Sequence, residues 1–157
     1  MSDSLVVVLY KDPILHKPCQ NVVIIDEPLI DLAGQMLVTM QRYRGVGLSA
    51  NQVGLDKNFC VAAFDGGKKQ MALINPKIIG HSKKKVLLYE GCLSAPKVFP
   101  PVKRYQSVTV QFQTFTGEVV TYEFTDMDAR IIQHELDHLA GKTVVDPYIK
   151  LPKEFLK

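Results

Sequence analysis

The chain has 157 residues, a formal net charge of +3 and 46% hydrophobic residues. This length fits one compact domain, residues 1–157, and leaves no room for two. The composition excludes a disordered, collagen-like or coiled-coil chain, and no apolar run approaches the roughly 20 residues that a membrane-spanning helix needs.

The first predicted helix begins at Asp26-Glu27-Pro28 and ends near Arg44. Proline suits the first turn of a helix, and acidic residues there interact favourably with the positive end of the helix dipole. The segment Gly45-Val46-Gly47 breaks the pattern. Between these limits apolar residues recur at helical spacing, at Leu29, Leu32, Met36, Leu37 and Met40.

Strands follow this helix. Thr116-Gly117 predicts the turn of a hairpin between the last two of them. The stretch from Pro96 to Pro101 cannot be a central strand, because proline has no N–H to donate. The predicted strands are Phe59–Phe64, Gln70–Ile74, Val86–Tyr89, Ser107–Phe112 and Glu118–Phe124.

A second helix is predicted from about Asp126 to Ala140. Thr125 or Asp126 can cap its start, and Gly141 occupies the position where helices often end in a left-handed residue. The order of helix, strands and helix predicts an α+β fold in which a largely antiparallel sheet packs against this central helix.

The second predicted helix contains His134-Glu135-Leu136-Asp137-His138, an H-E-x-x-H sequence. Residues four apart share one face of a helix, so both imidazoles can reach one ion while Glu135 stays free to carry protons. The pattern is a known metalloprotease signature. A surface helix with charged residues placed by chance is the plain alternative, but the apolar neighbours Ile131, Ile132 and Leu139 predict a mostly buried helix.

A catalytic metal site usually has three protein ligands and one open position, so a third ligand is needed. An extended form of the motif would require histidine where Val144 stands, and Glu154 is the remaining downstream alternative. Cys92, in Glu90-Gly91-Cys92-Leu93-Ser94, is the better candidate, because it follows an apolar strand and the glycine beside it allows close approach of a ligand.

A third segment, Gly45–Gln52, is rich in glycine and follows a helix. A phosphate-binding loop would instead follow a strand and open a helix. A helix-ending turn explains the glycines but does not require the polar pair Asn51-Gln52. An amide such as that of Gln52 can donate a hydrogen bond to a developing oxyanion.

Together the three segments resemble the motifs of the peptide deformylase family, G-x-G-L-A-A-x-Q, E-G-C-L-S and Q-H-E-x-D-H. They stand here, in the family's order, as Gly45–Gln52, Glu90–Ser94 and Gln133–His138. The resemblance runs from about Leu9 to Leu151. It is broken at Ser49, where the family usually has alanine.

The resemblance implies a hydrolase that removes the formyl group from the N-terminal formylmethionine of nascent polypeptides and releases formate. It implies one divalent metal ion per chain, natively Fe(II) with zinc or nickel as alternatives, held by Cys92, His134 and His138. Glu135 would be the general acid and base. The side chain of Gln52 and the backbone N–H of Leu93 would hold the oxyanion.

A pocket for methionine is also expected. The segment Lys97–Pro101 is more apolar than the family leads us to expect and predicts an effect on what lies beyond methionine. A Glu90–Arg104 ion pair is predicted to fix the loop that carries Cys92. The predicted pocket residues are Val46, Gly47, Gly91, Arg130 and Ile131.

Two other classes stay open at this point: a metallopeptidase that cuts internal bonds, and a structural zinc module, which usually has four protein ligands. The scattered lysines and the lack of a nucleic-acid motif predict no sequence-specific binding of nucleic acid. The three cysteines form no close pair, and the start lacks the basic region of a signal peptide, so we expect a cytoplasmic protein. The expected partners are the formylmethionine ends of nascent polypeptides, near the ribosome and away from membranes, and the chain is expected to be a monomer.

Overall fold

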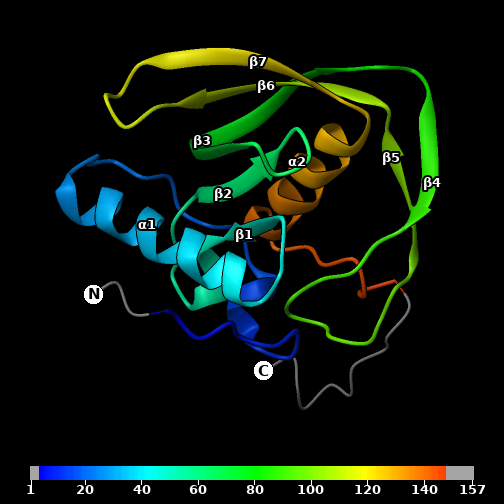
Figure 1. Cartoon of the computed structure of the whole chain (residues 1–157), viewed down its shortest axis with the longest axis horizontal. Helices are drawn as coiled ribbons and strands as arrows, with labels where there is room; N and C mark the ends of the chain where they lie inside the picture. The colour runs from blue at the N-terminus through cyan, green and yellow to red at the C-terminus, as the bar shows by residue number, and fades with distance from the viewer. Residues whose placement is uncertain (1–3, 148–157) are drawn as a thin grey trace.

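The computed structural model describes residues 4–147 of the chain (Figure 1). Its two α-helices are α1 (Glu27–Arg42) and α2 (Asp126–Leu139), and its two short 3-10 helices are η1 (Pro13–His16) and η2 (Ala50–Val53). None of the helices in the described part is long and apolar enough to span a membrane. The strands are β1 (Gly47–Ser49), β2 (Phe59–Phe64), β3 (Lys69–His81), β4 (Lys85–Tyr89), β5 (Pro101–Tyr105), β6 (Ser107–Gln113) and β7 (Val119–Thr125).

The strands form a five-stranded sheet in the order β1-β2-β3-β6-β7 and a separate two-stranded ribbon of β4 and β5. Every pair of neighbouring strands is antiparallel. The predicted α+β fold is therefore confirmed, as is the hairpin of β6 and β7. Gly117, in the turn of that hairpin, has a φ of +83°, a conformation that glycine adopts without strain.

The strand β2 is buried along its whole length. Side chains alternate between the faces of a strand, and both faces of β2 are covered. Phe59, Val61 and Ala63 pack with the apolar face of α1, whereas the alternate residues pack with α2. The two helices therefore cover opposite faces of the sheet, which explains why β2 reads as a continuous apolar run.

The helix α2 occupies the centre of the molecule. It packs against β1, β2, β6 and β7 of the large sheet and against β5 of the ribbon (Figure 1). Gly141, just after the helix, has the predicted left-handed conformation with a φ of +81°. A Cβ atom there would lie 2.6 Å from the backbone carbon of Lys17, so the close approach of η1 to α2 also depends on glycine.

Two strands were not predicted and one is longer than predicted. β1 lies inside the glycine-rich segment and pairs with β2. β5 begins at Pro101 in the ribbon, which agrees with the exclusion of proline from a central strand. β3 continues past Asn75-Pro76 to His81. The pairing of β3 with β6 shifts register between Ile74 and Lys77, so these two residues bulge out of the ladder without ending the strand.

Candidate active site

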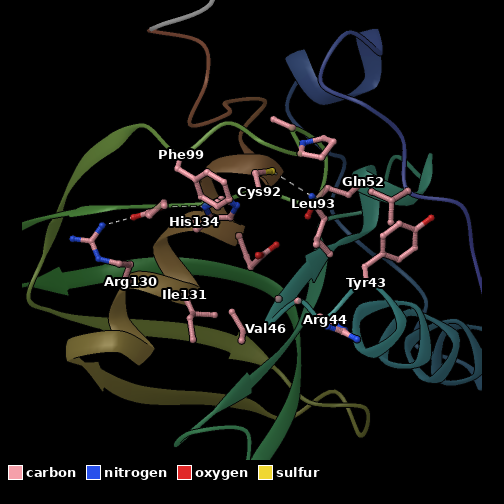
Figure 2. A pocket seen from close by; sticks show the side chains of 18 of the residues that line it. Tyr43, Arg44, Val46, Gln52, Cys92, Leu93, Phe99, Arg130, Ile131 and His134 are labelled. Carbon is pink, nitrogen blue, oxygen red and sulfur yellow. Dashed lines mark hydrogen bonds and ion pairs between the residues drawn. The ribbon is translucent and has the colours of Figure 1, made fainter.

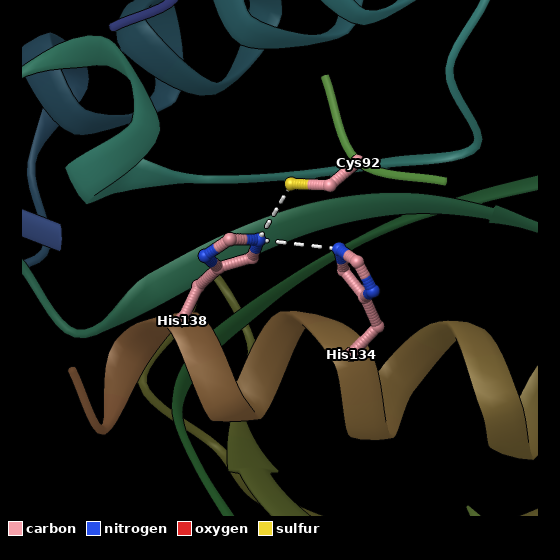
Figure 3. A group of neighbouring side chains, drawn as sticks. All are labelled: Cys92, His134 and His138. Atoms are coloured by element: carbon pink, nitrogen blue, oxygen red, sulfur yellow. Dashed lines mark hydrogen bonds between the residues drawn. The ribbon is translucent and has the colours of Figure 1, made fainter. Parts of the chain in front are cut away.

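His134 and His138 lie one turn apart on the face of α2 that points toward the loop after β4 (Figure 3). Their Nε2 atoms are 3.1 Å apart. The helical spacing of the motif therefore places the two imidazoles together, and the packing of α2 against the sheet and the ribbon encloses them.

Cys92 approaches the two histidines from the loop that follows β4, where it forms an isolated bridge with Ala95. Its Sγ lies 3.3 Å from Nε2 of His138. The three candidate ligand atoms all lie within 4.8 Å of one another, and no other group of this kind occurs among residues 4–147. Glu154, the downstream alternative, lies outside the described residues.

The donor set fits a metal ion. Atoms bound at about 2.0–2.3 Å to one tetrahedral ion lie roughly 3.3–3.6 Å apart, and the separations of 3.1 and 3.3 Å around Nε2 of His138 are close to this range. One thiolate and two neutral imidazoles suit Fe(II), zinc or nickel better than the hard ions Mg²⁺ and Ca²⁺, which prefer oxygen ligands.

Glu90 is the buried hub of the surrounding hydrogen bonds. Its Oε1 lies 3.0 Å from Nδ1 of His134, which leaves Nε2 of that ring for a metal ion. Arg104 donates to both carboxylate oxygens at 2.9 and 3.0 Å, so the predicted Glu90–Arg104 pair is confirmed. Nδ1 of His138 has no hydrogen-bond partner among the described residues, so it lacks the support that His134 receives.

These contacts shift the protonation of the groups around Glu90. Burial by itself would raise the pKa of Glu90, but hydrogen bonds with His134 and Arg104 outweigh it and lower that pKa to about 2. Burial opposes the charge of His134, yet hydrogen bonds with Cys92 and Glu90 raise its pKa to about 10. Because a ligand imidazole must be neutral, a metal ion at this site would displace a proton from His134.

Glu135 lies between the two histidines in sequence, and its side chain lines the cavity. The residue is 3% exposed, and its Oε2 atom has no hydrogen-bond partner. Burial raises the pKa of Glu135 to about 7, so the carboxyl group can both accept and release a proton near neutrality. A Cβ atom on Gly47 would lie 2.5 Å from Oε1 of Glu135, which explains the glycine at this point of β1.

Gln52 comes to the same place from the short helix η2. Its Nε2 donates a hydrogen bond of 3.0 Å to Oγ of Ser94 and lies 3.7 Å from Sγ of Cys92. Leu93, next to Cys92, lines the same cavity. The residues expected to hold an oxyanion and to carry protons are thus gathered beside the three candidate ligands.

A cavity of about 830 Å³ opens beside this group (Figure 2). All five residues predicted for the methionine pocket line it. The guanidinium of Arg130 is already engaged by other groups. It donates hydrogen bonds to Glu90, to the carbonyl oxygen of Val102 at 3.0 Å and to the carbonyl oxygen of Val86. The aliphatic part of Arg130 is therefore the part left to contact a ligand.

Sequence reasoning missed several apolar residues of the same cavity. They come from four separate segments, namely the end of α1, β4, the loop after β4 and α2, so no local pattern groups them. Of these residues only Phe99 was indicated by the sequence, because it belongs to the unusually apolar segment Lys97–Pro101. A Cβ atom on Gly91 would lie 2.8 Å from the Phe99 ring, so the glycine of the cysteine motif lets this ring approach. Among the apolar residues that line the cavity outside the predicted pocket are Tyr43, Leu88, Tyr89, Phe99 and Met127.

A site with three protein ligands leaves a coordination position for water or substrate, as catalytic sites do and closed structural sites do not. With a buried carboxyl group beside such a set of candidate ligands, the fold and the site define a metal-dependent hydrolase. A family model described as polypeptide deformylase matches residues 4–154. The chain therefore belongs to the peptide deformylase family, metal-dependent enzymes that remove the N-formyl group from nascent polypeptides.

Individual relatives agree with this assignment. A peptide deformylase of Pseudothermotoga lettingae is 42% identical over 138 residues, 88% of this chain and 79% of the relative. The crystal structure of the Thermotoga maritima peptide deformylase has a TM-score of 0.88 at 37% identity and covers 92% of this chain and 97% of its own. A Met-Ala-Ser-bound class I type b peptide deformylase of Acinetobacter baumannii has a TM-score of 0.87 at 33% identity and covers 93% and 99%.

Proposed function

We propose that residues 1–157 form one catalytic domain in which Cys92, His134 and His138 hold one divalent metal ion and Glu135 moves the protons of deformylation. The observation that carries the proposal is the buried Glu135 carboxyl, which has an oxygen without a hydrogen-bond partner beside the three ligand atoms. A structural metal site would have no use for such a group.

The proposed chemistry is hydrolysis of the formamide C–N bond. A metal ion, when bound, supplies a Lewis acid that lowers the pKa of water. Glu135 accepts a proton as water attacks the formyl carbon, and it returns a proton to the nitrogen as the C–N bond breaks. The products are formate and a peptide with a free amino terminus. The side-chain amide of Gln52 and the backbone N–H of Leu93 donate to the oxygen that becomes negative in between.

We place the methionine side chain among Val46, Gly47, Gly91, Arg130 and Ile131. The burial of Ile131 and the engaged guanidinium of Arg130 leave apolar surface toward the cavity. A relative with the same fold binds Met-Ala-Ser, a peptide that begins with methionine. The aromatic rings of Tyr89 and Phe99 at the cavity are then available to residues beyond the methionine.

The proposed partners are the formylmethionine ends of nascent polypeptides. Because these ends emerge during translation, we propose action near the ribosome and in the cytoplasm by a monomer. Binding of the peptide terminus requires neither a membrane nor sequence-specific contact with nucleic acid.

The test of this function is anaerobic purification, metal analysis and measurement of formate release. We expect release from formyl-Met-Ala-Ser and none from the N-acetyl form of the same peptide. An unformylated peptide should show no cleavage of its internal bonds. Internal cleavage would favour a metallopeptidase, and one bound metal per chain without formate release would favour a structural zinc module.

The Gln52→Leu variant is expected to lose roughly 10²- to 10³-fold in kcat, because leucine has nearly the same size but cannot donate to the oxyanion. The measurement is steady-state kinetics with formyl-Met-Ala-Ser at equal metal content. The exposed Gln41, on the surface of α1, provides the matched control Gln41→Leu. If Gln52→Leu raises only KM, the amide binds the substrate and does not stabilise the oxyanion.

Fe(II) is the proposed native ion, with zinc and nickel as alternatives. We expect the Fe(II)-loaded protein to lose activity in air faster than the zinc-loaded protein, because zinc has no redox chemistry and iron exposes the Cys92 thiolate to oxidation. One metal-free preparation is divided, loaded with each ion and followed by activity and by the mass of the Cys92 peptide. Equal lifetimes with an unmodified Cys92 would argue against Cys92 as a ligand of the iron.

A further inference from the structure

The hydroxyl group of Ser49 lies at the centre of a buried polar cluster outside the proposed set of reacting groups. Ser49 is 0% exposed, at the end of β1 and directly before η2. Its Oγ is 2.8 Å from Oδ1 of Asn51 and 3.1 Å from Oε1 of Gln52. Because both neighbours are carbonyl oxygens, the hydroxyl can only donate to them, and its single hydrogen is shared between the two acceptors.

The surroundings of Gln52 fix which end of its amide faces the cavity. Oε1 accepts from the backbone N–H of Ser49 at 3.1 Å and from the Ser49 hydroxyl at the same distance. A flipped amide would place its NH₂ group against that N–H, two donors facing each other. The NH₂ group therefore points away, toward Ser94 and Cys92.

The surroundings of Asn51 connect the same hydroxyl to α2. Oδ1 of Asn51 accepts from Ser49, and Nδ2 donates to the carbonyl oxygen of His138 at 2.6 Å. Asn51 is 0% exposed, so neither bond faces bulk solvent. One hydroxyl thus contacts the amide that faces the cavity and the amide that holds the end of α2 where His138 stands.

We propose that Ser49 is a positioning residue for deformylation, whose hydroxyl acts together with its backbone N–H to keep the Gln52 amide oriented so that its NH₂ group can donate to the oxyanion. This inference rests on the oxyanion role proposed above for Gln52. Ser49 touches neither substrate nor metal in this scheme. Its removal acts on the orientation of the donor, so turnover falls while substrate affinity does not.

The test compares Ser49→Ala with Thr39→Val. Thr39 is a matched control, because it is equally buried and its hydroxyl makes two hydrogen bonds, with Leu5 and Gln35, in α1. We expect Ser49→Ala to lower kcat roughly 3- to 10-fold, the effect of about one hydrogen bond, with KM within about twofold. Thr39→Val should lower the melting temperature without changing kcat by more than about twofold.

A double-mutant cycle tests whether Ser49 acts through Gln52. In a Gln52→Leu background the effect of Ser49→Ala on kcat should disappear, because residues that act as a unit are not additive. An undiminished effect would overturn the proposal, and so would a Ser49→Ala protein that loses only thermal stability.

A readout independent of activity uses the zinc-loaded protein, which is suited to NMR because zinc is d¹⁰ and diamagnetic. The side-chain NH₂ of Gln52 should exchange its hydrogens roughly 3- to 10-fold faster in Ser49→Ala than in the original protein, the effect of about one hydrogen bond, and unchanged exchange would overturn the proposal. If Gln52→Leu keeps full activity, the oxyanion role itself is wrong, and the exchange rates still show whether Ser49 orients the amide.

Discussion

Replacement of Glu135 by glutamine is expected to lower kcat by about 10²-fold or more while the metal content stays unchanged. The amide has the size of the carboxyl but cannot shuttle protons. The carboxyl is well suited to this task, because burial raises its pKa to about 7 and one of its oxygens has no other hydrogen-bond partner. The measurement is formate release by Glu135→Gln with zinc bound, together with metal analysis of the same sample.

The matched control for this prediction is Glu123→Gln. Glu123 is an exposed acid on β7, so its substitution removes the same charge without touching the cavity. We expect its kcat to remain within about twofold of the original protein. Near-normal turnover of Glu135→Gln with the metal retained would remove Glu135 from the mechanism and leave the proton transfer to another group.

Replacement of Glu90 by glutamine is expected to destabilise the protein by about 3–5 kcal/mol, the usual cost of removing one partner from a buried ion pair. Glu90 is 7% exposed and pairs with two arginines, Arg104 and Arg130, as well as with His134. Without its charge both guanidinium groups stay buried without full compensation. The measurement is urea unfolding of Glu90→Gln beside Glu123→Gln, for which we expect less than about 0.5 kcal/mol.

The pH dependence of this effect follows from the lowered pKa of Glu90. A carboxyl group whose pKa falls from 4.5 to about 2 on folding contributes stability that is fully present above pH 4.5. That contribution is lost as the pH falls through about 2. The difference in stability between the original metal-free protein and Glu90→Gln should therefore shrink as the pH is lowered from 4.5 toward 2. A difference that is small at neutral pH, or that does not change with acid, would contradict the central role of Glu90.

The same substitution should weaken metal binding, because Glu90 fixes the ring of His134. Loss of such an outer partner commonly costs about 10- to 100-fold in metal affinity. Competition with a zinc chelator measures this change. Equal zinc affinity in Glu90→Gln and Glu123→Gln would show that the His134 ring is held by packing alone.

Local sequence was sufficient to predict the secondary-structure elements whose apolar residues follow a regular pattern along the chain. The period of α1, the continuous apolar run of β2 and the hairpin of β6 and β7 were each predicted within a few residues. The spacing of His134 and His138 placed both imidazoles on one helix face for the same reason, since a helix brings residues four apart together whatever surrounds it.

Tertiary structure decided what depends on pairing and on distant segments. β1 has only three residues, too few for a local pattern, and it is a strand because β2 supplies its hydrogen bonds. Cys92 is separated from His138 by 46 residues. The sequence analysis named both residues as candidate ligands of one metal ion. Their contact, however, arises from the packing of α2 beneath the loop after β4.

The polar contacts around the site were the hardest to predict. The Glu90–Arg104 pair was foreseen, but the engagement of Arg130 with the same carboxylate was not. The sequence showed serine at position 49, where the family usually has alanine. It did not show that the serine hydroxyl contacts two side-chain amides. A hydrogen bond requires donor and acceptor to meet within about 3 Å at a suitable angle, and side-chain identity alone does not determine such a meeting. The sequence thus determined which chemical groups the site contains, and the packed fold determined which of them face one another.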